Sequence, residues 1–296
     1  MLSRSRASRL KAVLDPFVDA FDAAGRIGFD PVEAPRRYTD PVDQEVAGLV
    51  AAGLAYGRAD VFRPKLFGVL GEMGASPAAF AVSFDPRKDG ARLAPYAYRF
   101  NLPSDLGALI AGAGAAIDRH GSLGRFFASE LAASGQRLQQ ALSAFSLGIR
   151  EEGTARVRPA MGEPRAIEHL LADPAKGGAC KRLLLYLRWM VRDDEVDLGT
   201  WAGLVSPAVL INPVDTHVMR IARLLGLTRR KDLSWRTAEE ITASLRLLDP
   251  ADPVRYDFAL CHLGMSGACP ATRRRENCRI CPLRSECLAG RRIAAA

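Results

Sequence analysis

The sequence predicts an all-α protein, and three observations carry this prediction. Apolar residues recur at three- and four-residue intervals through most of the chain, as in Leu10 to Phe21 and Val218 to Leu225. Glycine and proline punctuate these segments. Only Ala94 to Phe100 alternates in a way that allows a short strand. With 296 residues, 48% of them hydrophobic, the chain can bury a sizeable core in one large or two intimate domains.

The first half of the chain is expected to form a series of helices. Residues 8 to 27 make the first helix, which Gly25 closes. Asp40 to Glu45 is an acid-rich helix start with proline in its first turn, and the small, apolar run that follows to Ala55 indicates a central helix packed on every side. Helical spacing also marks Val61 to Met73, Asp105 to His120, Leu123 to Ala133 and Leu138 to Ile149. The polar stretch Gly153 to Pro164 predicts a surface loop.

The charge balance suits a polyanionic partner without proving one. Lys plus Arg is 41 against 33 for Asp plus Glu, and the sequence pI is near 9.4. No run of about 18 apolar residues is free of charge, so no membrane span is expected. Met1 to Lys11 is rich in Arg and Ser like a transit peptide, but acidic residues follow it closely. We therefore expect a cytoplasmic protein.

Asp215 stands where a short apolar approach becomes a helix. The approach ends in Pro213-Val214-Asp215-Thr216-His217, and the spacing of the following apolar residues gives one buried helical face. A carboxylate at a helix N-terminus is held by free backbone N–H groups and by the positive end of the helix dipole. Asp215 is therefore expected to be ionised and fixed in direction, either as an N-cap alone or as a catalytic group.

A second helix start carries a lysine. Gly177 and Gly178 precede it, and their backbone N–H groups could seat a phosphate oxygen or could belong to an ordinary turn. Lys181 lies in the first helical turn, where the dipole and the neighbouring Arg182 are expected to lower its pKa. A lysine with a lowered pKa can act as an amine nucleophile, whereas an ordinary lysine here would be solvated.

Four of the six cysteines crowd into the C-terminal end. Cys269, Cys278, Cys281 and Cys287 are separated by eight, two and five residues, which favours one [4Fe-4S] cluster, with a structural zinc ion as the alternative. Between the first two cysteines lies Arg273-Arg274-Arg275, whose guanidinium groups suit DNA phosphates. Cys180 and Cys261 are expected to be core residues.

The turn Tyr56-Gly57-Arg58 ends the central helix. An aromatic side chain and an arginine at this point could contact a nucleic acid, or could simply complete the core and face solvent.

Val214-Asp215-Thr216-His217, followed by the four cysteines, resembles the helix-hairpin-helix DNA glycosylases of the endonuclease III and adenine glycosylase group. Within that superfamily the pattern, which includes Cys180-Lys181-Arg182-Leu183, is most similar to an uncharacterised bacterial branch labelled as a domain of unknown function. Three departures stand out. The first cysteine spacing is eight where the group has six, the interval from Lys181 to Asp215 is longer, and the group's Leu-Pro-Gly-Val-Gly-x-Lys hairpin is present only as Gly177-Gly178-Ala179-Cys180-Lys181.

The resemblance implies two helical lobes with the active site in the cleft. A helical-barrel lobe with a degenerate hairpin would span residues 45–192, and residues 1–44 plus 205–296 would form a second lobe that carries the cysteine loop, 269–287. The resemblance also implies that the four cysteines hold [4Fe-4S] and that Asp215 is catalytic, with Lys181 the nucleophile of a bifunctional enzyme. It places Tyr56 where relatives fill the gap left by a flipped base.

Residues and resemblance together predict a DNA repair glycosylase, with or without AP-lyase activity, that removes a damaged base flipped into the inter-lobe cleft. The expected partner is damaged double-stranded DNA, bound by a monomer through Gly177, Gly178, Arg273, Arg274, Arg275, Tyr56 and Arg58. The alternative is a non-catalytic iron-sulfur protein of the same fold that binds DNA or RNA structure. A third candidate is a cluster protein whose partner is another protein.

Overall fold

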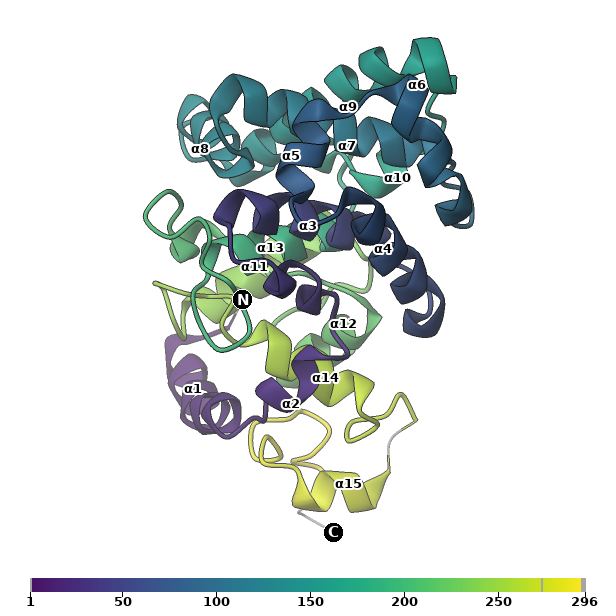
Figure 1. The fold of residues 1–296 in the computed structure, drawn as a ribbon. Helices are drawn as coiled ribbons and strands as arrows, with labels where there is room; N and C mark the ends of the chain where they lie inside the picture. Colours follow the sequence, from purple (N-terminus) through teal and green to yellow (C-terminus); the bar gives the residue numbers. More distant parts are fainter. Residues whose placement is uncertain (1, 273, 294–296) are drawn as a thin grey trace. The chain divides into compact units, whose positions relative to one another are not determined.

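The computed structural model describes residues 2–272 and 274–293, and Figure 1 traces their helices. This part of the chain contains isolated β-bridges but no strand, so the all-α prediction is confirmed. The alternating stretch Ala94 to Phe100 instead lies in the end of a 3-10 helix, η3 (Gly90–Tyr96), and in a turn bridged from Tyr98 to Asn101. Among the described residues no single helix is long and apolar enough to cross a membrane. One bent helix pair, Ala59–Met73 with Pro77–Ser83, passes by length and composition alone.

The chain divides into two compact units. Unit 1 comprises Met1–Ala23, Gly177–Leu184 and Ser206–Ala296, and unit 2 comprises Ala24–Lys176 and Leu185–Val205. This division differs from the expected lobes in two places, because residues 24–44 belong to unit 2 and residues 177–184 belong to unit 1. The first turn of helix α11 (Lys181–Val191) therefore belongs to unit 1, and the rest of the helix belongs to unit 2.

Unit 2 is built from helices around α3, whose last ten residues are all buried. Besides the later part of α11, its helices are α2 (Ala24–Ile27), α3 (Pro41–Leu54), α4 (Ala59–Met73), α5 (Pro77–Ser83), α6 (Pro86–Asp89), α7 (Pro103–His120), α8 (Leu123–Ala133), α9 (Leu138–Met161) and α10 (Ile167–Leu170). The remaining short elements are η1 (Pro31–Glu33), η2 (Pro35–Arg37), η3 and η4 (Pro174–Lys176). The expected start of α3 is confirmed, because Asp40 caps it through the N–H groups of Val42 and Asp43 and Pro41 is its first residue.

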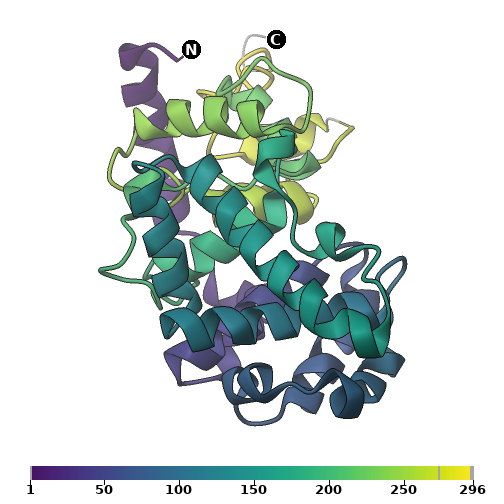
Figure 2. The same ribbon diagram turned by 90° about the horizontal axis from the view of Figure 1, so that it is seen from above.

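Two glycines let α7 and α9 approach closely, and the two helices lie side by side in Figures 1 and 2. A Cβ added to Gly112 would lie 2.0 Å from the carbonyl oxygen of Ile149, and one added to Gly153 would lie 1.8 Å from that of Ala108. The prediction of a surface loop from Gly153 to Pro164 was wrong. Helix α9 continues to Met161, because Gly153 is a buried contact point of the helix pair.

A buried carboxylate joins three parts of unit 2. Glu45 of α3 accepts hydrogen bonds from the N–H groups of Leu123 and Gly124 at 2.7 and 3.1 Å and from the indole of Trp201 at 2.8 Å. Burial raises the pKa of Glu45, although these donors oppose the shift. The start of α8 is thus fastened to the central helix by a side chain.

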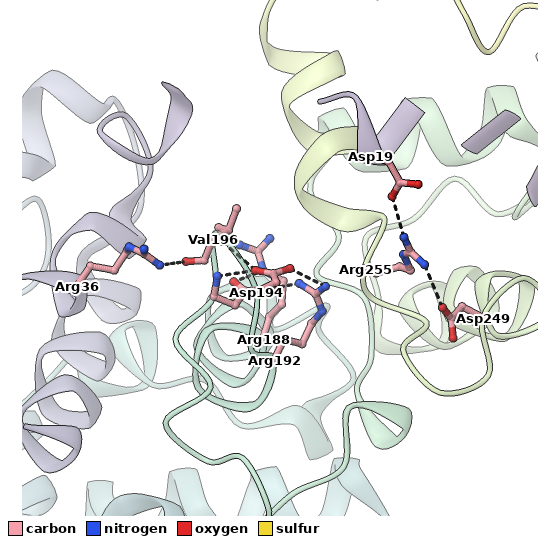
Figure 3. Close-up of polar contacts among 9 residues, drawn as sticks. Asp19, Arg36, Arg188, Arg192, Asp194, Val196, Asp249 and Arg255 are labelled. Carbon is pink, nitrogen blue, oxygen red and sulfur yellow. Dashed lines mark hydrogen bonds and ion pairs between the residues drawn. The ribbon is translucent and has the colours of Figure 1, made fainter. Parts of the chain in front are cut away.

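A second buried carboxylate in unit 2, that of Asp197, pairs with two arginines of the α11 segment. It accepts from Arg188 Nε at 3.1 Å and from Arg192 Nη1, and its side chain is 0% exposed. Arg192 also pairs with Asp194, as Figure 3 shows. Arg36 donates to the carbonyl of Val196 at 2.8 Å, so it fixes the same turn from η2.

Unit 1 contains α1 and the C-terminal helices. Its helices, besides the first turn of α11, are α1 (Arg4–Asp19), α12 (Thr216–Leu225), α13 (Trp235–Arg246), α14 (Asp257–Met265) and α15 (Arg275–Ile280), and η5 (Pro207–Val209) precedes α12. The expected first helix, residues 8 to 27, was wrong at both ends, because α1 begins at Arg4 and ends at Asp19. Arg255 pairs with Asp19 at 3.0 Å and with Asp249 at 3.5 Å (Figure 3), which ties α1 to the chain before α14.

We expect Asp197→Asn to destabilise the protein by about 3–5 kcal/mol, because it removes the buried charge that the guanidinium groups of Arg188 and Arg192 share. Urea unfolding followed by tryptophan fluorescence measures the change. Asp194→Asn is the matched control. The Asp194 side chain is 37% exposed, and an asparagine can still accept from the N–H groups of Val196 and Asp197, so it should cost less than about 1 kcal/mol. Equal costs for the two variants would contradict the assignment of Asp197 as the buried centre.

Candidate functional site

Asp215 is the N-cap of α12. Its backbone is extended, with φ −117° and ψ −171°, and its Oδ1 accepts from the N–H groups of His217 at 2.9 Å and Val218 at 2.8 Å. The approach before it is buried and fixed, since the amide of Asn212 donates to Asp257 Oδ1 at 3.0 Å. The geometry therefore gives the carboxylate one direction and leaves Oδ2 for another partner.

That partner is Lys181, the first residue of α11. Its Nζ donates to Asp215 Oδ2 at 2.8 Å, and the two residues are 34 positions apart in the chain. The Lys181 side chain is 35% exposed and that of Asp215 is 18% exposed. The two residues singled out by the sequence as candidate catalytic groups thus form one ion pair within unit 1 that solvent can still reach.

The ion pair fixes the charge of both groups. Burial alone would raise the pKa of Asp215, but the charge and hydrogen bond of Lys181 and the N–H of Val218 lower it below its ordinary value. Burial alone would lower the pKa of Lys181, but Asp215 chiefly, with Cys261 and Asp257, raises it above the ordinary value. The expected lowering of the Lys181 pKa was wrong, because the nearby negative charges, that of Asp215 above all, outweigh the effect of burial.

Cys261 is a third member of this site. Its Sγ lies 3.9 Å from Asp215 Oδ2 and 3.6 Å from the sulfur of Met265, one turn further along α14. The sequence predicted a core residue here, because α14 is apolar and Cys261 is 46 positions from Asp215. Only the packing of α12 against α14 brings the thiol to the carboxylate, so no local signal could have found it.

The glycine turn before α11 is pinned to the start of α13. Gly177 has a positive φ of 80°, and its carbonyl accepts from the N–H of Trp235 at 2.9 Å. Gly178 is bridged to Ser234, which caps α13. Cys180, directly before Lys181, also has a positive φ, 46°, which is uncommon for a residue with a Cβ. The turn that presents Lys181 is therefore held by α13 as well as by its own glycines.

Tyr56 and Arg58 form a separate group in unit 2. The Tyr56 hydroxyl lies 2.7 Å from Asn101 Oδ1 and 2.9 Å from the carbonyl of Tyr98, and its ring stacks on Phe100. Arg58 pairs with Asp60 at 2.6 Å and is exposed. Tyr56 is thus held in place, and the aromatic ring most open to solvent in this group is that of Phe100, which is 54% exposed.

The four clustered cysteines line one cavity of about 280 Å³ in unit 1. Burial raises the pKa values of Cys269 and Cys281, and the neighbouring cysteines add to the rise, because a second negative charge close by disfavours the thiolate. No three of the described His, Cys, Asp and Glu side chains are grouped closely enough to hold a single metal ion. The four cysteines thus share the lining of one cavity.

The expected arginine loop lies beside this cavity. Arg273 is outside the described residues. Arg274 lines the cavity and directly precedes α15, and Arg275 begins that helix. Both are exposed. Part of the expected loop is thus helical, and Cys278 lies on α15 itself.

A family model matches the chain over residues 30–266, which is most of its length. The model is described as a protein of unknown function, DUF2400. The chain belongs to this family. The matched residues of this DUF2400 chain include Lys181, Asp215 and Cys261, and they end before Cys269. Neither a curated protein nor a solved structure matches it.

In this DUF2400 chain, Asp215→Asn is expected to lower the pKa of Lys181, because the charge that most strongly opposes the effect of burial is then removed. Reductive methylation with carbon-13 label and an NMR titration of the lysines measure the shift, and Lys181→Gln assigns the signal. Asp194→Asn, which removes a carboxylate from unit 2, should leave that titration unchanged. A Lys181 pKa that stays raised in Asp215→Asn would refute the ion pair as its cause.

Proposed function

We propose that this protein is a DNA glycosylase that releases a damaged base by hydrolysis, with Asp215 as its catalytic carboxylate. The observation that carries the proposal is the Lys181–Asp215 ion pair at the start of α12. Two residues selected from the sequence for the same chemistry, and separated by 34 positions, meet at hydrogen-bond distance in a solvent-accessible place. The target nucleotide would have to leave the duplex to reach such a site.

The chemistry follows from the charge of Asp215. Breaking the N-glycosidic bond leaves the electron pair on the base and develops positive charge on the sugar carbon C1′. A fixed carboxylate beside that carbon stabilises the charge. Because the pKa of Asp215 is lowered, the group stays ionised but is a weak base, which suits an electrostatic role better than proton abstraction. Water then adds to C1′ and loses its proton to solvent.

The state of Lys181 favours this hydrolytic course over a lyase. An amine must be uncharged to attack C1′, and the raised pKa of Lys181 keeps it as an ammonium ion at neutral pH. Transfer of its proton to Asp215 is also unfavourable, because the pKa of that carboxyl is lowered. Lys181 is thus a positioning residue, which holds Asp215 ionised and in one orientation.

The C-terminal cysteines fit a polynuclear cluster. All four line one cavity of about 280 Å³. A single zinc ion would need four sulfurs at about 2.3 Å from one point. We infer that Cys269, Cys278, Cys281 and Cys287 hold [4Fe-4S] and that bound metal stabilises the C-terminal part of unit 1. The cluster would act as a scaffold, since the site chemistry is assigned to Asp215.

Asp215→Asn should keep the fold and DNA binding but lose about a hundredfold or more in base release, because asparagine can cap α12 without supplying the charge. Single-turnover assays on duplexes that each carry one damaged base measure the rate. In the wild type, falling pH in the weakly acidic range should not abolish activity by protonating Asp215, since its pKa lies below 3.8.

Lys181→Gln and borohydride treatment separate the two mechanisms. The wild type should yield no borohydride-trapped DNA adduct, and Lys181→Gln should retain some base release. A trapped adduct that disappears in Lys181→Gln would instead make Lys181 the nucleophile. If no damaged duplex loses a base while DNA is still bound tightly, the protein is a binding module and the glycosylase proposal fails.

Protein purified without oxygen should be brown and contain about four iron atoms per chain. Cys278→Ser should lose iron and destabilise the C-terminal part of unit 1. Cys261→Ser is the matched control, because Cys261 does not line the cysteine cavity and should leave the iron content unchanged. A colourless protein with one tightly bound zinc would disprove the cluster.

A further inference from the structure

A further cavity in unit 1 adjoins the cysteine cavity, because Arg220, Leu224 and Ala289 line both. Its volume is about 1,020 Å³, and it is open to solvent. Residues from the start of α1, from the outer side of α12, from the loop between α12 and α13 and from the C-terminal tail line it. Neither Lys181 nor Asp215 belongs to its lining. We call it the basic cavity.

Positive charge dominates this lining. Six basic residues contribute to it, namely Arg6, Arg220, Arg223, Arg229, Lys231 and Arg292. Among the described lining residues the one carboxylate is that of Glu240, and this group already accepts from the Thr228 hydroxyl at 3.0 Å and from the N–H of Arg229 at 3.3 Å. A concave surface with charges of one sign focuses its field and concentrates a ligand of the opposite sign.

Two of the six basic residues are built into the walls. Arg6 donates to the carbonyl of Leu225 at 2.9 Å, and Arg220 donates to the carbonyls of Gly264 and Cys269 at 3.0 and 2.6 Å. In both, Nε is buried and has no hydrogen-bond partner among the described residues. Arg6 and Arg220 therefore hold the walls of the cavity in place through backbone carbonyls, and we leave both out of the proposed ligand contacts.

The other four basic residues are Arg223, Arg229, Lys231 and Arg292. All are exposed, and none forms an ion pair within residues 2–272 and 274–293. By contrast, Arg58 and Arg92 are also exposed but pair with nearby carboxylates. Four cations that share one concave surface and form no ion pair there repel one another, and a bound polyanion would relieve this repulsion.

The other residues of the lining indicate which part of a polyanion the cavity would recognise. None of the described residues in the lining is aromatic, so these residues offer no ring on which a base could stack. Its apolar members are aliphatic, such as Leu227 and Leu233. Guanidinium groups match phosphate oxygens in geometry and charge, which favours recognition of phosphates over recognition of bases.

We propose that the basic cavity binds a ligand with several adjacent phosphate groups, held by Arg223, Arg229, Lys231 and Arg292. A free nucleoside polyphosphate and the backbone of a nucleic-acid strand present this same chemistry. Neither member of the Lys181–Asp215 pair lines the basic cavity, so the proposal stands whether or not the protein releases bases.

The test uses the full chain and a triple variant, Arg223→Gln with Arg229→Gln and Lys231→Gln. These side chains are exposed, so the variant should fold, and Arg220 is left unchanged because it contacts Cys269. The matched control is Arg87→Gln with Arg125→Gln and Arg156→Gln, which removes the same charge from exposed positions of unit 2. The probes are inorganic triphosphate, followed by calorimetry, and a short fluorescent oligothymidylate, followed by anisotropy.

We expect the triple variant to weaken binding of at least one probe by about tenfold or more, and the control to bind as the wild type does. For the oligothymidylate, the slope of log affinity against log salt should also fall by about two. Tight triphosphate binding would identify a free polyphosphate as the source, and binding of the strand alone would identify a nucleic-acid backbone. If the triple variant and the control bind both probes equally, the proposal is overturned. A base-release assay on the same variant reports separately on the glycosylase proposal.

Discussion

The carboxylate of Asp215 is the group on which the candidate site depends. One oxygen satisfies two N–H groups of α12 that no residue of the helix itself can satisfy, and the other holds the ammonium of Lys181. The same group therefore starts one helix and positions the first residue of another. Removing its charge would release Lys181, and removing its oxygens would also uncap α12. Substitution by asparagine therefore tests the role of the charge, whereas substitution by alanine also tests the role of the helix cap.

The basic residues of this chain differ in whether a carboxylate partner neutralises their charge. In unit 2 several arginines have carboxylate partners, such as Arg63 on Glu33 and Arg192 on Asp194. In unit 1 the lining of the basic cavity brings together cations whose side chains lack such partners in the described part of the chain. A net charge of +8 says only that a polyanion is attracted. The positions of the unpaired cations in the basic cavity indicate where a polyanion would bind.

The sequence predicted the helices well where the signal is local. The start of α3 follows from Asp40 and Pro41, and the capping role of Asp215 follows from its place before an amphipathic run. Predictions failed where a distant partner decides the outcome. Gly153 suggested a loop, but it allows α9 to contact α7. The pKa of Lys181 was expected to be lowered, and this prediction failed because the carboxylate that raises the pKa is 34 residues away in the sequence. Cys261 was missed for the same reason.

The close contact of α7 with α9 limits the mutational robustness of unit 2. At most surface sites an exchange costs little, but at Gly112 and Gly153 even alanine would place a carbon about 2 Å from a carbonyl oxygen of the facing helix. These two codons should therefore be nearly free of accepted changes in a saturation library selected for folded protein, although neither lies in a proposed site. Depletion at such positions would report on helix spacing and should not be taken as a sign of catalysis.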